Sequence, residues 1–96
     1  MSYQVRVGKR IRKAMRRFPL QDQARIMAVL RALADKPRPA GCLPVKRVER
    51  GTYRLRVGNY RIIYVILDDE QVIMVARVSR RSEGTYKKLQ PPNTAI

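Results

Sequence analysis

A predicted hairpin constrains the fold of this chain more tightly than any other feature. Two runs rich in strand-forming residues, TYRLRV and YRIIYVIL, flank a Gly-Asn pair over residues 52–67. Two such runs joined by a two-residue glycine loop are typical of a β-hairpin. Counting back from this loop sets Arg56 directly opposite Arg61. The sequence therefore predicts an antiparallel pair of strands that brings two positive charges side by side.

Strand alternation divides this hairpin into an apolar face and a basic face. Side chains two residues apart point the same way, and one face then receives Tyr53, Leu55, Val57, Tyr60, Ile62 and Tyr64. The other face receives Arg54, Arg56 and Arg61. Like charges directly opposite each other weaken a sheet by up to about 1 kcal/mol. The arginines therefore either extend into water or bind an anion.

The segment before the hairpin predicts one strand and two helices. Residues 3–7 alternate as an opening strand would, and apolar residues then recur at helical spacing as far as Phe18. Pro19 ends this first helix because proline interrupts helical hydrogen bonding. A second amphipathic helix is expected over residues 20–35, so that the two form a helical hairpin.

Further strands are predicted on both sides of the hairpin. Three prolines and a glycine make residues 36–44 a loop, and residues 45–48 follow as a short edge strand. Residues 71–78 form the last strand of an antiparallel meander. This strand and residues 60–67 are apolar on both faces, so we expect them at the centre of the sheet, covered by the helices.

The charge of the chain narrows the classes of function. Lysines and arginines number 22 against 7 aspartates and glutamates, a formal net charge of +15. Such a field favours a polyanionic partner, most commonly nucleic acid, with an acidic protein as the alternative. The chain has no histidine and one cysteine, Cys42, which excludes a Ser-His-Asp triad, a Cys-His pair and a Cys/His zinc cluster. We expect no metal and no cofactor.

The sequence favours a soluble, cytoplasmic protein with no membrane contact. Its first residues lack the apolar core of an export signal, and its longest apolar run, residues 62–67, is too short to span a bilayer. A single cysteine cannot form an internal disulfide, which fits a reducing compartment. Residues 90–96 are expected to form a flexible tail.

A second group of basic residues lies near the end of the last predicted strand. If residues 68–70 form a three-residue loop, Arg77 lies beside Arg61 on the basic face, whereas a two-residue turn sends Arg77 to the other face. The chain continues with Arg80, Arg81, Tyr86, Lys87 and Lys88. Arginine binds phosphate through paired hydrogen bonds, and tyrosine stacks on a base or handles a proton, so the group suits a phosphodiester. A solvated basic surface with Tyr86 packed at the edge of the core is the alternative.

Three consecutive carboxylates are interpreted as a turn. A magnesium ion needs oxygens that converge from several directions, whereas Asp68, Asp69 and Glu70 follow one another at the tip of a hairpin. The other carboxylates form no obvious pair at catalytic spacing. Both observations argue against a metal-dependent nuclease.

One long segment resembles a known toxin family. The stretch GTYRLRVGNYRIIYVILDDEQVIMVARVSRRSEGTY, preceded by the two helices and the KPRPAG loop, resembles the RelE branch of the RelE/ParE superfamily of bacterial type II toxins. The likeness spans residues 3–88, and the YRLRVGNYRIIY hairpin is its most specific part. It implies an α+β fold class: a small single domain over residues 1–96, with a two-helix hairpin packed on a twisted, mainly antiparallel sheet of about four strands.

The resemblance also implies an activity and its residues. It implies an mRNA interferase, a ribosome-dependent endoribonuclease that cuts mRNA in the decoding site and is held inactive by a cognate antitoxin. Arg54 and Arg56 match basic strand positions of such toxins, and Arg61 matches a phosphate-binding arginine. Arg81 matches an arginine that stabilises charge near the leaving oxygen, and Tyr86 matches a tyrosine near the C-terminus. The implied reaction is metal-independent attack of the RNA 2′-hydroxyl on the adjacent phosphate. The other basic residues near the last strand, Arg77, Arg80, Lys87 and Lys88, are candidate substrate-binding residues by their position alone.

Two other functions remain open at this stage. The first is a ParE-like protein that poisons DNA gyrase without cutting nucleic acid, and the shared fold does not separate it from a nuclease. The second is a basic nucleic-acid-binding protein without activity, which leaves the arginine pair across a tight hairpin unexplained. The concentrated set of arginines and a tyrosine favours the nuclease.

Overall fold

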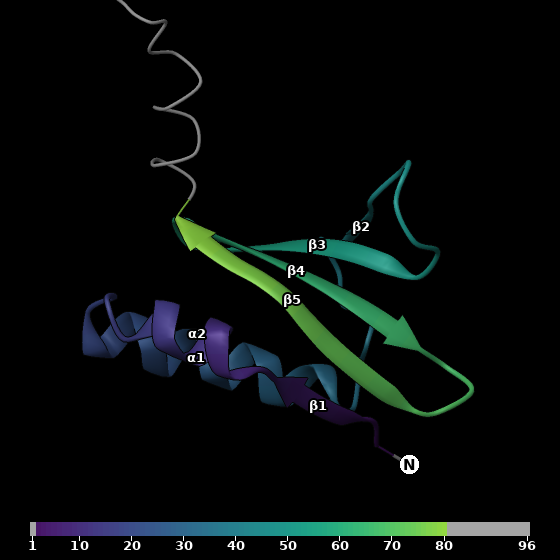
Figure 1. The fold of residues 1–96 in the computed structure, drawn as a ribbon, viewed down its shortest axis with the longest axis horizontal. Helices are drawn as coiled ribbons and strands as arrows, with labels where there is room; N and C mark the ends of the chain where they lie inside the picture. The colour runs from purple at the N-terminus through teal and green to yellow at the C-terminus, as the bar shows by residue number, and fades with distance from the viewer. Residues whose placement is uncertain (1, 81–96) are drawn as a thin grey trace, which may run out of the picture.

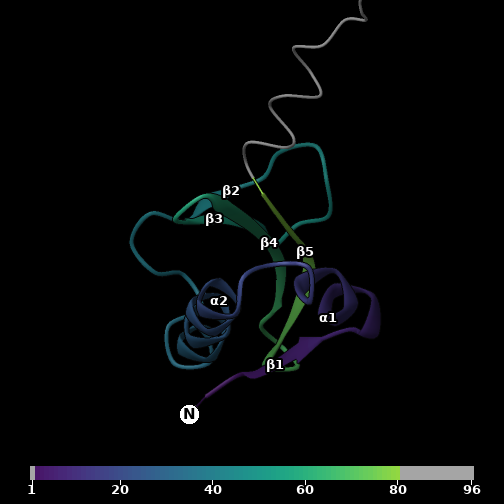
Figure 2. The same cartoon turned by 90° about the vertical axis from the view of Figure 1, so that its left-hand side faces the viewer.

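Two helices cover one face of a five-stranded sheet in the computed structural model, which describes residues 2–80 (Figure 1). The elements are β1 (Gln4–Val7), α1 (Lys9–Met15), α2 (Leu20–Leu33), β2 (Leu43–Pro44), β3 (Thr52–Val57), β4 (Tyr60–Leu67) and β5 (Val72–Arg80). Figure 1 shows α1 and α2 below strands β3 to β5, and Figure 2 looks along the helices, with β3 above α2. Of the helices in this range, none has the length and apolar character needed to cross a membrane. The predicted α+β fold is confirmed.

The strand order is β1-β5-β4-β3-β2. The apolar strands β4 and β5 are therefore central, as predicted. Strands β2 to β5 form an antiparallel meander, whereas β1 pairs with β5 in parallel. The sheet is thus mixed and has five strands rather than about four. The parallel edge arises because the two helices carry the chain across the covered face before the meander begins.

The short edge strand lies earlier in the chain than the sequence predicted. It is Leu43–Pro44, inside the proline-rich segment that was expected to be a loop, and it pairs with β3. The prediction of a strand over residues 45–48 is wrong. The Val45 N–H still donates to the Thr52 carbonyl at 2.9 Å, but Arg47 then has a φ of +66°. This left-handed conformation ends the extended run.

Strand β5 and the turn before it are both longer than predicted. β5 continues as far as Arg80 because Tyr60, the first residue of β4, still pairs with it. At the other end Leu67 pairs with Val72. The turn therefore contains the four residues Asp68–Gln71 rather than two or three. The interpretation of the consecutive carboxylates as a turn is confirmed.

The core lies between the helices and the inner face of the sheet. Its largest fully buried side chains are Ile26, Leu30, Leu33, Ile62, Tyr64 and Ile73. The apolar face predicted for the hairpin therefore packs on α2. The Tyr64 hydroxyl donates to the Pro37 carbonyl at 2.8 Å, so this polar group is satisfied within the core.

Candidate functional site

The β3–β4 hairpin brings its arginines together as the sequence predicted. Gly58 opens the turn with a φ of +58°, which glycine adopts without steric cost. Asn59 stays outside the left-handed region, so the turn follows the type II′ pattern. The resulting register pairs Arg56 with Arg61. Both side chains are exposed on the outer face of the sheet, as is that of Arg54.

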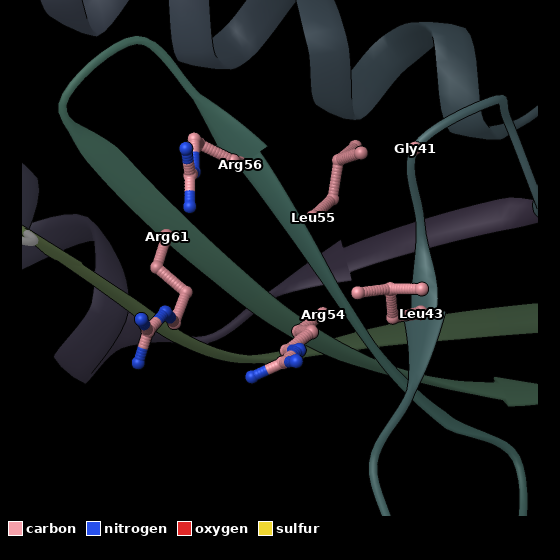
Figure 3. Close-up of a pocket in the computed structure, with 6 residues that line it drawn as sticks. All are labelled: Gly41, Leu43, Arg54, Leu55, Arg56 and Arg61. Atoms are coloured by element: carbon pink, nitrogen blue, oxygen red, sulfur yellow. The ribbon is translucent and has the colours of Figure 1, made fainter.

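These three arginines line a hollow of about 200 Å³ on the outer side of the hairpin (Figure 3). The remaining lining residues are Gly41, Leu43 and Leu55. Leu43 comes from β2, whereas the three guanidinium groups come from β3 and β4. Since none of the six lining residues is acidic, the hollow combines positive charge with a small apolar wall.

No carboxylate within residues 2–80 forms an ion pair with the arginines of the hollow. The ion pair recorded in this range joins Arg38 to Asp68 elsewhere on the sheet. A guanidinium group without a fixed acceptor keeps its N–H donors for an incoming ligand. Phosphate fits such donors best because two parallel N–H groups can bind two of its oxygens. The hollow can therefore hold the backbone of a nucleic acid.

Arg77 lies on the same outer face, although not beside Arg61. It pairs with Ile63, and Arg61 faces Ser79. The four-residue turn shifts the predicted register by one residue, and a β-bulge between Ile63 and Tyr64 shifts it by one more. Because side chains alternate with a period of two, the combined shift leaves Arg77 on the predicted face. The predicted direct partner was wrong.

Arg80 belongs to the inner face of the sheet. It pairs with Tyr60, whose ring is buried and whose hydroxyl donates to the Asp22 carboxylate at 2.7 Å. Burial and Asp22 raise the pKa of Tyr60, while a hydrogen bond from Arg80 opposes this rise. Arg80 therefore contacts the hydroxyl that links β4 to α2. Its role as a substrate contact stays a prediction.

Asp22 was missed by sequence reasoning. It lies 38 residues before Tyr60 and carries no motif that marks it as a partner. The available signal was its place in the first turn of a predicted helix, where an acidic residue also suits the helix dipole. That signal explains a helix terminus and does not point to a contact with the sheet.

Four of the predicted site residues lie outside the described residues. They are Arg81, Tyr86, Lys87 and Lys88. The arginine-lined hollow is therefore the part of the predicted site that the structure brings together.

A second hollow, largely apolar, lies between α2 and β3. It has a volume of about 340 Å³ and is lined by Val29, Ala32, Leu33, Lys36, Pro39, Ala40, Leu55, Arg56 and Val57. Leu55 and Arg56 belong to both hollows, so the apolar groove adjoins the arginine-lined one. Sequence reasoning did not find the groove because it forms between a helix and a strand that are distant in the chain.

The carboxylate at the other turn of the sheet serves the fold. Asp68 accepts a hydrogen bond from the Tyr3 hydroxyl at 2.6 Å and pairs with Arg38 at 2.9 Å. These two partners hold the pKa of Asp68 below its ordinary value. Between residues 2 and 80, no three histidine, cysteine or acidic side chains gather closely enough to hold a metal ion.

Comparison with known proteins assigns the chain to a family. The family model of the ParE toxin of the parDE type II toxin-antitoxin system matches residues 6–84. The chain belongs to the ParE toxin family. It is therefore a type II toxin of the RelE/ParE superfamily, and the resemblance drawn from its sequence is confirmed.

Individual relatives carry RelE names. The chain is 32% identical to the putative toxin RelE1 of Methanocaldococcus jannaschii over 89 residues, and these residues make up 91% of this chain and 98% of the relative. The RelBE2 toxin-antitoxin complex of Mycobacterium tuberculosis matches with a TM-score of 0.74 and 27% identity, over 84% of this chain and 100% of the other. The archaeal RelE-RelB complex of Pyrococcus horikoshii matches with a TM-score of 0.75 and 26% identity, over 84% and 97%. These likenesses place the toxin in the RelE branch.

Proposed function

We propose that this toxin is a ribosome-dependent endoribonuclease that cleaves mRNA in the ribosomal A site. The observation that carries the proposal is the hollow lined by Arg54, Arg56 and Arg61, which holds three positive charges and no carboxylate. The mutual repulsion of Arg56 and Arg61 is offset once a phosphate lies between them. The pair is thus arranged for an anion before the anion arrives.

The proposed reaction is attack of an RNA 2′-hydroxyl on the adjacent phosphate. The O2′–P bond forms as the P–O5′ bond breaks, and negative charge grows on the phosphate oxygens. The 2′-hydroxyl proton passes to water, and the leaving O5′ takes a proton from water, so the products are a 2′,3′-cyclic phosphate and a 5′-hydroxyl. Arg61 and Arg56 meet this charge from two neighbouring strands, as donors positioned before the reaction begins. Arginine stays protonated at neutral pH, so these residues supply charge and orientation rather than proton transfer. Charge supplied in this way takes the place of a metal ion in the proposal.

The remaining site residues complete the proposal. Arg81 stabilises charge on the leaving oxygen, and Tyr86 acts near the reacting groups as a proton-handling or stacking side chain. The RNA backbone is bound by Arg77, Arg80, Lys87 and Lys88. Arg77 has the most direct support among these four because it is exposed on the same face as the hollow.

A cognate antitoxin is the second proposed partner. The solved relatives from Mycobacterium tuberculosis and Pyrococcus horikoshii are toxin-antitoxin and RelE-RelB complexes. The groove between α2 and β3 has the apolar character of a protein interface and reaches the arginine-lined hollow at Arg56. An antitoxin segment that seats apolar side chains there and a carboxylate on Arg56 keeps RNA out of the hollow. Action on the ribosome also places the toxin in the cytoplasm.

The test is cleavage of a defined mRNA, free and loaded on ribosomes with an empty A site, mapped by primer extension. Cuts that appear only on the ribosome support the proposal and reveal the codon preference. Cutting of free RNA contradicts ribosome dependence. Arg61→Ala should lower the rate of these cuts about a hundredfold or more, whereas Arg31→Ala, which removes an equal charge from an exposed position of α2, should not.

The family name supports one alternative function. The matching family model is named for ParE, and a ParE-like poison of DNA gyrase without nuclease activity is the alternative that the sequence resemblance left open. A folded and toxic protein that cuts RNA in neither condition, and that inhibits gyrase supercoiling, would replace the nuclease proposal with this one.

A further inference from the structure

The helix α1 and the two residues after it carry a second concentration of positive charge. Six of the nine residues from 9 to 17 are basic and all six are exposed: Lys9, Arg10, Arg12, Lys13, Arg16 and Arg17. The apolar residues between them, Ile11, Ala14 and Met15, turn toward the core. α1 packs on the covered face through Met15, which is part of the core, whereas Arg54, Arg56 and Arg61 of the hollow are exposed on the outer face. The two basic surfaces are therefore separate.

This concentration of charge opposes the stability of α1. The helix has only seven residues, no side-chain cap at Gly8 and no acidic residue in its first turn. Lys9 and Arg10 stand at its N-terminal end, where the helix dipole disfavours cations. Lys9 and Lys13 also repel each other at a spacing of four residues, as do Arg12 and Arg16. Arg12 and Lys13, in the last turn, do suit the helix dipole. The cations of the first turn and the like-charge pairs break local rules without a structural gain, which is typical of functional surfaces.

The fold does not neutralise these charges. Among the residues that the structure describes, no ion pair involves a basic side chain of residues 9–17. Arg12 does donate from Nε to the Val7 carbonyl at 3.0 Å, which anchors one side chain but leaves its charge in place. A ligand that supplies several negative charges is therefore the missing complement.

The surface of α1 favours a phosphate backbone over a protein. A protein interface has an apolar centre, often aromatic, inside a polar rim. The large apolar residues exposed in the described range are Leu20, Leu43, Val48 and Met74, and none of them belongs to α1. Phosphate contacts, in contrast, need only a row of Lys and Arg side chains.

We propose that α1 is a second RNA-binding surface that grips the phosphate backbone of structured RNA outside the strand to be cut. The source of that RNA, the ribosome, rests on the proposed function. Two surfaces on different faces let the toxin hold the ribosome with one while the hollow receives the mRNA. Anchoring of this kind raises the local concentration of the hollow around its substrate.

The test measures binding of a fluorescent RNA duplex of about 16 base pairs. Fluorescence anisotropy gives the affinity at each of several salt concentrations. The variant Lys13→Gln/Arg16→Gln/Arg17→Gln should bind at least about tenfold more weakly and lower the slope of log K against log salt by about 2 to 3. The matched control Arg31→Gln/Lys46→Gln/Arg50→Gln loses the same charge from exposed positions elsewhere. It should change both quantities much less. Equal losses in the two variants would overturn the proposal.

Two further arms separate the remaining outcomes. A triple variant of α1 that loses affinity for polyglutamate but keeps its affinity for the duplex overturns the proposal in favour of an acidic protein. The double variant Arg16→Gln/Arg17→Gln changes only residues beyond Met15, the last residue of α1. It replaces the triple variant in the binding test if the triple variant has a lower melting temperature than wild type. Wild-type protein that binds the duplex through α1 but cuts no mRNA supports this proposal and contradicts the proposed function.

Discussion

The arginines at the two turns that flank β4 differ in whether the chain itself supplies their hydrogen-bond acceptors. At the Gly58-Asn59 turn, Arg56 faces Arg61 across the strands with no carboxylate bound to either. At the Asp68–Gln71 turn, Arg38 pairs with Asp68 and also donates to the Tyr53 hydroxyl at 3.1 Å. The guanidinium carbon of Arg38 lies 5.4 Å from the centre of the same ring.

The difference separates structural arginines from binding arginines. Where an arginine holds the fold together, the chain supplies its acceptors, and Asp68 is held in turn by Tyr3. Where the chain sets two arginines against each other, the acceptor has to come from outside. The first kind of arginine should matter for stability and the second for activity.

Backbone strain introduced at the Gly58-Asn59 turn should give the largest change in stability. Gly58→Ala places a side chain at a φ of +58° and should cost about 1 to 2 kcal/mol of unfolding free energy. The Arg25 guanidinium, 2.7 Å from the new Cβ, can move aside because it is the far end of a flexible side chain. Gly58→Asn is the matched control, since asparagine is accepted better than alanine at the positive-φ position of this turn type. Denaturant unfolding measures both, and equal losses would contradict the assigned turn.

Removal of the tyrosine hydroxyl that ties this turn to α2 should have a smaller effect. Tyr60→Phe loses the hydrogen bond to Asp22 but keeps the ring contact with Phe18, and should cost about 0.5 to 1.5 kcal/mol. Tyr53→Phe loses the hydrogen bond that its hydroxyl accepts from Arg38. Because Tyr53 is more exposed, this substitution should lower the free energy of unfolding by less. Thermal unfolding of the two variants measures both losses. A larger loss for Tyr53→Phe than for Tyr60→Phe would show that the contacts of Arg38 contribute more to stability than the hydrogen bond to Asp22.

The smallest predicted effect is a pH dependence at the other turn. The pKa of Asp68 lies below its ordinary value of 3.8 because Tyr3 and Arg38 stabilise the charged form. Its contribution to stability is therefore complete above the unfolded pKa and is lost as the pH falls through the lower, folded pKa. Wild type should melt above Asp68→Asn at neutral pH, and the gap should narrow as the pH falls below the ordinary aspartate pKa and close once it is below the lowered, folded pKa. A gap that stays constant in acid would mean that the charge of Asp68 is not involved.

The hairpin could be predicted because its determinants are local. Strand alternation and a glycine turn set the opposition of Arg56 and Arg61 within six residues. The face of Arg77 was right although the assumed register was wrong, because the longer turn and the β-bulge each shift the strand by one residue. No residue type marks that bulge, so the sequence did not predict it.

Contacts between distant segments could not be predicted. The parallel pairing of β1 with β5, the Asp22–Tyr60 hydrogen bond and the groove between α2 and β3 all depend on how the helices lie on the sheet. The misplaced edge strand has a different cause. Residues 45–48 favour a strand by composition, and the left-handed conformation of Arg47 overrides that preference.

The most direct test of the comparison is a pair of substitutions, Arg61→Ala and Arg38→Ala, each followed by thermal unfolding and by mRNA cleavage on ribosomes. Arg61→Ala should lower the cleavage rate about a hundredfold or more, as loss of a transition-state donor does, and leave the melting temperature unchanged or slightly higher. Arg38→Ala should lower the melting temperature and leave cleavage unchanged. An Arg61→Ala protein that cleaves at the wild-type rate, or that loses stability as Arg38→Ala does, would contradict the account.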